Sequence, residues 1–405
     1  LTPKDTYPAL LKTSDNTVIN STLKTISDGS GDDTVLQLST LRVGVKSDST
    51  VTTQTSSVIQ SSTTNANLVI APNGTGALIA QIPDGTATGG NARGTNAIDL
   101  QQVRSNSNQV ASGNYSVLLG GQGSRTQGLN SVVVGGNGNF SNGNFSVIVG
   151  GNGSGSAGAY SGVLGGFGNS AAQDYSAVLG GQSNNANGTW SSVLGGLGNT
   201  AGGQSSVVGG FTNTASSNYS TVSGGQSNTA STNTHATVVG GLSNTASGIY
   251  SIAGGQNTTA SGGRSFAFGE SAQATGSNSI ALGGTSINAI GAYSTALNGT
   301  GTQAGATYSL AQGYFAVSYL YGQTAFTGTG FVFGEYGNCQ QSTLVANRSA
   351  ALASNATTVL SLDGTGVTNL IIPSGNNRLW AAKITATAFV SVAGGTLVLG
   401  DSYMG

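Results

Sequence analysis

The sequence predicts an all-β protein built as a β-solenoid, in which the short strands of successive coils stack in parallel. Three observations predict this fold. A unit of about 15 residues repeats over half of the chain, each unit carries one short β-branched segment bounded by Gly and Asn, and only 6% of the 405 residues are charged while 67 are Gly. Because 15 residues are too few for a helix pair or a β-α-β crossover, we expect a firm strand, a Gly-Gly turn, a weaker return strand and a second turn.

Gly-Gly pairs mark the repeat. They begin at residues 120, 135, 150, 165, 180, 195, 209, 224, 240, 254 and 283, and variants beginning at 269, 298 and 312 complete the series. The sequence therefore predicts about 14 coils with a 15-residue period, stacked about 4.8 Å apart into a rod on the order of 65 Å long. The glycines suit either a turn with positive φ or a close approach of two backbones.

Two aliphatic residues precede most of the pairs. Neighbouring residues of a strand point to opposite faces, so both faces of this strand should be buried. One face fills the interior of the coil, and the other is covered either by further copies of the chain or, in a wider monomeric solenoid, by the chain itself. We expect the core of the roll or of an oligomer to contain Leu119, Val134, Val149, Leu164, Leu179, Leu194, Val208 and Val239.

A Ser stands four residues before the pair and often follows an aromatic residue, such as Tyr160, Tyr175 or Trp190. The only histidine, His235, takes this aromatic position, so we interpret it as structural. The only cysteine, Cys339, lies in no recognisable motif.

Motifs that would indicate catalysis, cofactor binding or metal binding do not meet their structural requirements in this sequence. Residues 153–158 match G-x-G-x-x-G, but no helix follows to hold a phosphate. Calcium-binding repeats need a recurring Asp at a period of nine, and glycoside hydrolysis needs a pair of carboxylates in one cleft. We therefore predict that the chain is not an enzyme and holds no cofactor or metal.

The repeat resembles the head repeats of trimeric autotransporter adhesins of the YadA type. Residues 219–225 (Tyr-Ser-Thr-Val-Ser-Gly-Gly), 244–248 (Asn-Thr-Ala-Ser-Gly) and 278–283 carry the resemblance, which covers roughly 110–315. It implies a left-handed parallel β-roll that assembles as a homotrimer.

The flanks look like fibre proteins of tailed bacteriophages, especially marine ones. Residues 1–45, with Lys-Asp-Thr-Tyr-Pro at 4–8, and residues 67–99 carry this likeness. It implies a virion appendage, a tail or head fibre on the virion surface that is made in the host cytoplasm. Because the sequence stops at residues 401–405 without a terminal signature, we expect the natural polypeptide to continue.

We divide the chain into a virion-attachment segment (1–45), a β-rich connector (46–105), a YadA-like β-roll shaft (106–315), and an aromatic-rich cap with a distal β domain (316–405). Strand-like runs are expected at 34–45, 67–81 and 378–400. Between residues 105 and 334 the only charged residues are Arg125, Asp174, Arg264 and Glu270. Aromatic residues of the distal part cap the solenoid or form a sugar-binding surface, with Tyr314, Tyr319, Tyr321, Tyr336 and Trp380 as candidates.

The leading hypothesis is a homotrimeric virion fibre that acts as a rigid spacer and binds a glycan or protein of the host surface. Its N-terminal segment would dock onto other virion proteins. A net charge of −1 offers no attraction to nucleic acid, and no apolar run of 18 residues predicts membrane insertion. The alternatives are a purely structural virion decoration or whisker, the head of a bacterial trimeric autotransporter adhesin, and ice binding by a Thr-rich face, which the varying Thr positions disfavour.

Overall fold

The computed structural model describes residues 74–327 except 208, together with 72 and 341–343, and the backbone of six further strands near the ends of the chain. The chain divides into two compact units, residues 1–70 and 71–405. In the first unit, β1 (Lys12–Thr13), β2 (Lys24–Ser27), β3 (Asp33–Leu38) and β4 (Val43–Val45) form an antiparallel sheet in that order. Strands β3 and β4 lie within the run expected at 34–45, apart from the first residue of β3.

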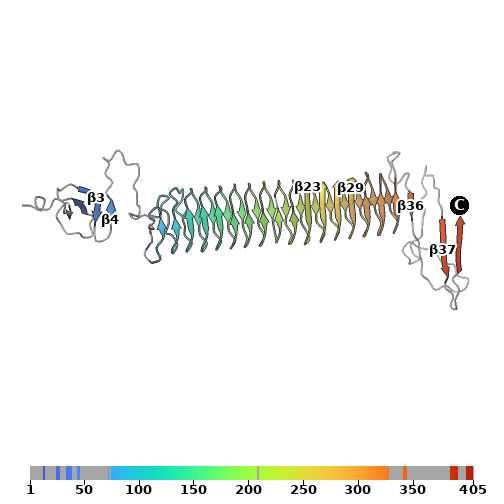
Figure 1. Cartoon of the computed structure of the whole chain (residues 1–405), viewed down its shortest axis with the longest axis horizontal. Coiled ribbons are helices and arrows are strands. Elements are labelled where there is room, and N and C mark those ends of the chain that lie inside the picture. The colour runs from blue at the N-terminus through green and yellow to red at the C-terminus, as the bar shows by residue number, and fades with distance from the viewer. Residues whose placement is uncertain are drawn as a thin grey trace, which may run out of the picture. The chain divides into compact units, whose positions relative to one another are not determined.

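The second unit contains a parallel β-solenoid, seen as a row of stacked coils in Figure 1. The longer strands of the coils form one sheet, which we call the front sheet. Its strands are β5 (Leu78–Ile79), β6 (Ile98–Asp99), β7 (Val117–Leu119), β9 (Val132–Val134), β11 (Val147–Val149), β13 (Gly162–Val163), β15 (Ala177–Val178), β17 (Ser192–Val193), β19 (Ser206–Val207), β21 (Thr221–Val222), β23 (Thr237–Leu242), β25 (Ile252–Gln256), β27 (Phe266–Glu270), β29 (Ile280–Thr285), β31 (Thr295–Leu297), β33 (Leu310–Gln312) and β35 (Thr324–Phe326).

The return strands form a second, 14-stranded sheet, which we call the back sheet. Its strands are β8 (Arg125–Thr126), β10 (Phe140–Ser141), β12 (Gly155–Ser156), β14 (Ser170–Ala171), β16 (Asn185–Ala186), β18 (Thr200–Ala201), β20 (Thr214–Ala215), β22 (Thr229–Ala230), β24 (Thr245–Ala246), β26 (Thr259–Ala260), β28 (Gln273–Ala274), β30 (Asn288–Ala289), β32 (Gln303–Ala304) and β34 (Val317–Ser318).

The register confirms the predicted fold. Each front strand pairs in parallel with the strand one repeat later, as Val163 with Val178, and each back strand does the same, as Ala171 with Ala186. The described residues contain no helix and form a β-solenoid of about 15 turns. Parallel pairing runs from Leu78 to Phe326 and so extends beyond residues 106–315 on both sides. The left hand of the roll stays a prediction.

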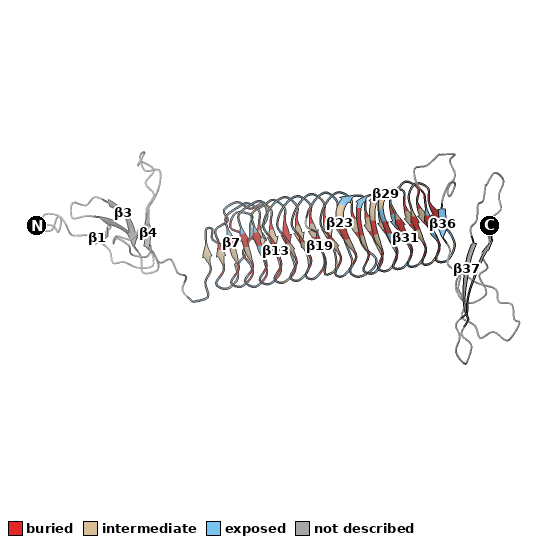
Figure 2. Cartoon of the chain, turned by 45° about the vertical axis from the view of Figure 1, so that its right-hand side comes forward, coloured by how far each residue is buried: buried red, intermediate tan, exposed pale blue. Residues whose placement is uncertain are grey.

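The interior is a set of one-residue columns that run along the solenoid. The second residue of every front strand from β7 to β35 is fully buried, as are Val163 and Val178, and so is the Ala of most back strands, such as Ala186 (Figure 2). Strand alternation explains this, because the residues on either side of the buried one must point outward. The solenoid is therefore thin, with one layer of small side chains between its sheets.

A buried asparagine ladder fixes the Gly-Gly turns. It consists of Asn139, Asn169, Asn184, Asn199, Asn213, Asn228 and Asn244. In a typical coil, the Nδ2 of Asn199 donates to the carbonyl oxygens of Gly195 at 2.8 Å and Gly210 at 2.9 Å, and its Oδ1 accepts from the Asn213 N–H at 2.9 Å. Each side chain thus ties its own turn to the next coil, and its buried polar atoms are satisfied.

The second glycine of each pair is required by the stacking of the coils. Gly181 has φ of +85°, and a Cβ there would lie 2.2 Å from the carbonyl oxygen of Gly196 in the next coil. The first glycine is under no such restriction at Gly180, where a Cβ would meet nothing within 4 Å. Close backbone approach therefore applies to the second residue of the pair, whereas positive φ is also found at the first residue of several pairs, such as Gly120 and Gly135.

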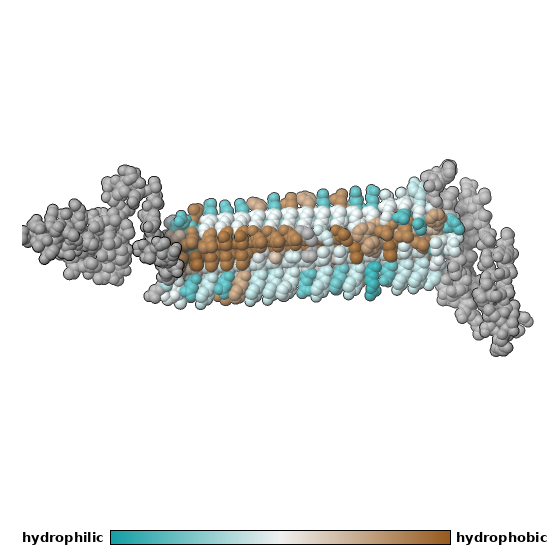
Figure 3. Space-filling model, in the orientation of Figure 1, coloured by the Kyte–Doolittle hydropathy of each residue, from teal (hydrophilic) through white to brown (hydrophobic). Residues whose placement is uncertain are grey.

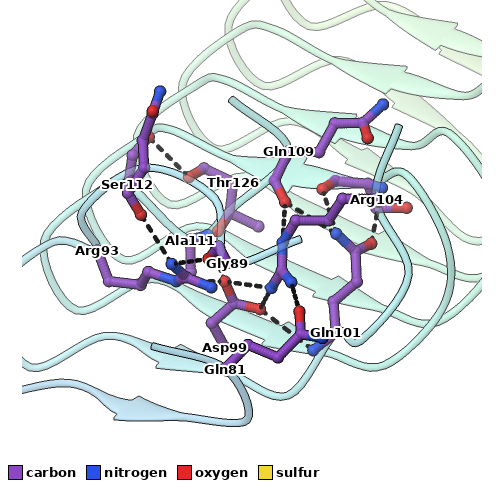
Figure 4. Close-up of polar contacts among 12 residues, drawn as sticks. Gln81, Gly89, Arg93, Asp99, Gln101, Arg104, Gln109, Ala111, Ser112 and Thr126 are labelled. Carbon is purple, nitrogen blue, oxygen red and sulfur yellow. Dashed lines mark hydrogen bonds and ion pairs between the residues drawn. The ribbon is translucent and has the colours of Figure 1, made fainter. Parts of the chain in front are cut away.

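A buried charged cluster fills the first coils (Figure 4). Asp99 is fully buried and accepts from the Nε of Arg93 at 2.7 Å and from the Nη2 of Arg104 at 3.0 Å. Gln101 donates to the carbonyl of Gln109 at 2.8 Å and accepts from the Ser124 N–H at 2.7 Å. Buried charge is tolerated here because both guanidinium groups are paired with the Asp99 carboxylate, and Nη2 of Arg93 is the one buried nitrogen of the two groups without a hydrogen-bond partner among the described residues.

The other end of the front sheet is covered by an antiparallel strand. β36 (Gln341–Thr343) pairs with β35, so the last solenoid strand is not an open edge. Farther along, β37 (Ile384–Val390) and β38 (Val398–Met404) form an antiparallel pair. β37 lies within the strand region expected at 378–400, and β38 extends past it.

Candidate functional site

The outer face of the front sheet carries an exposed apolar stripe. We define the stripe by seven aliphatic residues that stand just before a Gly-Gly pair: Leu119, Val134, Val149, Leu164, Leu179, Leu194 and Val239. It is unbroken from Leu119 to Leu194, and the polar Ser223 takes the same position in the coil before Val239. These seven side chains are between 38% and 57% exposed. The brown band along the shaft in Figure 3 shows apolar side chains gathered on this face. Monomeric proteins rarely expose contiguous apolar patches of this extent, which mark interaction surfaces.

The seven residues are therefore outside the coil and not in its interior. The interior is filled by the residues that precede them, among them Leu118, Val133 and Val163, which are fully buried. Val208, the eighth residue of the prediction, lies outside the described residues. The prediction that two adjacent aliphatic residues serve two different faces agrees with this placement, and the outer face is the one that the described residues leave exposed.

A column of stacked aromatic rings borders the stripe. It runs from Phe145 through Tyr160 and Tyr175 to Trp190, with ring centroids 4.9, 5.1 and 4.0 Å apart and planes within 4° of parallel. We call this column, with its continuation at Tyr219, His235, Tyr250, Tyr293 and Tyr308, the aromatic ladder. His235 stacks between Tyr219 and Tyr250, at 4.9 and 4.7 Å, as expected of a residue that takes the aromatic position.

Every residue of the aromatic ladder has a left-handed backbone conformation, with φ between 56° and 65°. This conformation costs a bulky L-residue roughly 1–2 kcal/mol. Stacking on a neighbouring ring contributes about 0.5–1.5 kcal/mol per pair and offsets that cost. Sequence inspection finds the aromatic position but not its conformation, because the strain and the stacking both follow from the coil register.

The distal aromatic candidates are spread over the end of the solenoid. Tyr314 is half-buried and packs edge-on against Phe315, with centroids 4.5 Å apart. Tyr319 is exposed, and its hydroxyl donates to Oε1 of Gln303 at 2.7 Å. Tyr321 meets Tyr308 edge-on, so it ends the aromatic ladder. Tyr336 and Trp380 lie outside the described residues, so the five are not brought together into one described surface.

The back sheet presents a largely neutral and polar surface, apart from the charged Arg125 and the apolar Phe140 on its first two strands. Thr200, Thr214, Thr229, Thr245 and Thr259 lie in register on its outer side. From the sequence the Thr positions are expected to vary, but the coil register aligns these five in one column. The column loses Thr on both sides of it, at Asn185 and Gln273, so the Thr face covers only part of the shaft.

The described residues show no arrangement for catalysis. No group of three or more His, Cys, Asp or Glu side chains that could hold a metal ion occurs among them. They also contain no helix long and apolar enough to cross a membrane. The described residues present three kinds of surface. These are the apolar stripe of the front sheet, the aromatic ladder beside it, and the Thr column of the back sheet.

A family model of the YadA head domain repeat matches the chain twice. The two copies cover residues 246–269 and 260–286, that is, strands β24 to β29 of the shaft. A search of curated proteins finds no match. The matched repeats and the solenoid fold fit an adhesin-like, surface-exposed fibre, and the repeats suggest homotrimeric assembly. The match lies inside the region where the sequence resembles the YadA head.

Proposed function

We propose that this chain forms a homotrimeric bacteriophage tail or head fibre that serves as a rigid spacer on the virion surface and as a host-surface adhesin. The apolar stripe carries the proposal. A half-exposed Leu or Val gains about 1 kcal/mol when it is covered, so the seven residues together contribute on the order of 5–10 kcal/mol per chain. That gain is comparable with the cost of association, and further outward apolar residues, such as Ile280 and Leu282, add to it.

The neutral composition supports a spacer. Stacked coils joined by continuous parallel ladders resist bending, and a surface with few charges does not adhere to nucleic acid or anionic lipid. Residues 1–45 would dock onto other virion proteins, and residues 316–405 would meet a host glycan or protein. The phage assignment is supported by the likeness of residues 1–45 and 67–99 to phage fibres.

The first experiment measures the mass of the purified chain by sedimentation equilibrium. We expect three copies, and we expect Leu179→Asp with Leu194→Asp to dissociate them, because six carboxylates would then be buried at the interface. Asn187→Asp with Ser216→Asp, on the outward side of the back sheet, is the matched control and should leave the trimer intact. A monomeric wild-type chain would refute the trimeric shaft.

Two further experiments separate the alternatives. Electron microscopy of virions labelled with an antibody against the shaft should show the protein on a tail or head fibre. Labelling of an uninfected bacterial surface would instead support the head of a trimeric autotransporter adhesin, which the YadA head repeats favour. Binding of the trimer to host cells would support the adhesin, whereas a virion fibre without binding would be a structural decoration.

A further inference from the structure

The front sheet has two long sides, one along the beginnings of its strands and one along their ends, and we call these sides its edges. The residues at the aromatic position of the repeat form the edge where each front strand begins. The other edge follows the Gly-Gly turns, and its residues are held in register by parallel bridges, as Phe167 with Gln182 and Gln182 with Leu197. We call these the aromatic edge and the Gly-Gly edge. Apolar side chains are exposed on both, including Phe167, Leu197, Phe211 and Leu242 on the Gly-Gly edge.

One coil carries opposite charges on its two edges. Arg264 occupies the aromatic position, with φ of 57°, two residues before β27 begins at Phe266. Glu270 ends the same strand at the Gly-Gly edge, in register with Gln256. Both side chains are exposed. They are the only charged residues between 175 and 327.

These two charges cannot pair within one chain. Glu270 lies six positions after Arg264, which is about 20 Å along an extended strand. Within the described part of the chain neither forms an ion pair, and the carboxylate of Glu270 only accepts from the Thr285 hydroxyl at 3.3 Å. An isolated surface charge is ordinary, but two opposite charges on opposite edges of one coil, in a neutral shaft, are complementary to a second copy.

Symmetry decides which residues meet. In a closed ring of parallel copies each contact is heterologous, so one edge of a chain meets the opposite edge of the next. Rotation about the shaft axis moves no residue along it, so the meeting residues belong to the same coil. In three coils the two edges match in character: Tyr160 with Phe167, Trp190 with Leu197, and Arg264 with Glu270. In other coils the Gly-Gly edge carries an amide side chain instead: Asn152, Gln182 and Gln226 in the coils of Phe145, Tyr175 and Tyr219.

We infer that the copies of this shaft join edge to edge, with Arg264 of one copy paired with Glu270 of the next and the aromatic ladder packed on the Gly-Gly edge of its neighbour. The inference rests on the proposed homotrimer. It assigns the ladder to a second copy and not to a glycan, because the inner rings of each run, Tyr160, Tyr175 and His235, already stack on a neighbouring ring with both of the faces that a sugar would use. These inner rings offer only their edges to a partner, and ring edges pack well against aliphatic and aromatic side chains.

Cross-linking tests the juxtaposition. Arg264→Cys and Glu270→Cys are combined in a Cys339→Ser background and treated with a bifunctional maleimide. Its span is well under the roughly 20 Å that separate the two positions within one chain, so it can link them only between copies. The expected product is a covalent trimer on a denaturing gel, because each copy is linked to two different neighbours. Each single-cysteine variant is the control and should yield no covalent trimer. Covalent dimers alone would indicate an isologous contact and overturn the inference.

Charge reversal tests the energetics. Arg264→Glu or Glu270→Arg places like charges at all three joints, so the trimer should dissociate about 10- to 100-fold more readily, as measured by urea titration. The double reversal should restore the trimer to within threefold of the wild type. The penalty of each single variant should shrink in 1 M salt, where the screening length is about 3 Å.

The two levels of failure are distinguishable. A monomeric wild-type chain would refute the proposed function itself. A stable trimer that yields no covalent trimer, and in which single and double reversals behave alike, would leave the proposed function standing and overturn only the edge-to-edge arrangement.

Discussion

Replacing one residue of the asparagine ladder tests whether buried amides hold the coils together. The change is Asn199→Ala, in the middle of the shaft. Asn199 is fully buried, and its side chain supplies the hydrogen-bond partner of the Asn213 N–H and of the Gly195 carbonyl oxygen. The carbonyl of Gly210 keeps its bond from the Leu197 N–H at 2.9 Å.

The magnitude follows from the two groups left without a partner. A buried donor or acceptor that loses its bond costs about 1–3 kcal/mol. Two such groups predict a loss of about 2–6 kcal/mol per chain. The matched control is Asn187→Ala in the same region, where the side chain is exposed and the expected change is within about 0.5 kcal/mol.

The assay is urea unfolding followed by circular dichroism at fixed protein concentration, with hydrogen exchange as a local readout. Because each coil contacts only its neighbours, exchange should accelerate around residues 195–215 and remain unchanged around 125–140. If Asn199→Ala unfolds at the same urea concentration as Asn187→Ala, the ladder does not stabilise the turns and the reasoning is wrong.

Four further predictions concern single positions. Gly181→Ala should disrupt folding because its Cβ would lie 2.2 Å from the Gly196 carbonyl oxygen, whereas Gly180→Ala should fold, and equal expression and thermal stability of the two would contradict the stacking argument. Tyr175→Asn, which keeps a residue type found with positive φ at Asn130, should lose two ring contacts, about 1–3 kcal/mol in total, and alter the near-ultraviolet dichroism of Trp190; an unchanged spectrum would argue against the ladder in solution. Asp99→Ala should cost about 3–5 kcal/mol by leaving Arg93 and Arg104 buried without a carboxylate, and hydrogen exchange of the first coils should rise, with unchanged exchange as the contrary result. Hydrogen bonds from the backbone N–H and the hydroxyl of Thr86 lower the pKa of Asp84, so these bonds should be present above the unfolded pKa near 4 and be lost as the pH falls below the folded value. The measurement is the amide chemical shift of Thr86 against pH, with Asp84→Asn as the control, and a shift that does not titrate in this range would contradict the prediction.

Much of the fold could be predicted because the repeat is local. The Gly-Gly spacing, the β-branched segment and the polar return segment give one strand, one turn and one weak strand per coil, and the parallel registers confirm that pattern. The aromatic position was also visible, including its use by His235.

The candidate site was predicted less completely. Both aliphatic residues of each repeat read alike in the sequence, yet Val163 is buried and Leu164 is 57% exposed. The Asn residues read as part of a polar surface segment, but they are buried. The coil brings each amide against the backbone of its own turn, four residues earlier, and of the next turn, 11–13 residues later. No pattern of polarity distinguishes such an amide from an exposed one.

The sequence by itself determined the coil: its period, its strands, its glycine turns and the lack of charge along the shaft. Those features depend on neighbouring residues and on the alternation of a strand, so they can be read along the chain. Only the tertiary structure decided which face of the strand is closed, which polar side chains are buried, and that Arg264 and Glu270 lie on opposite edges of one coil. These three features depend on the path of the backbone around one coil and on which residues of the previous coil it then contacts. Both are set by the packing of the stacked coils and not by neighbouring residues in the sequence.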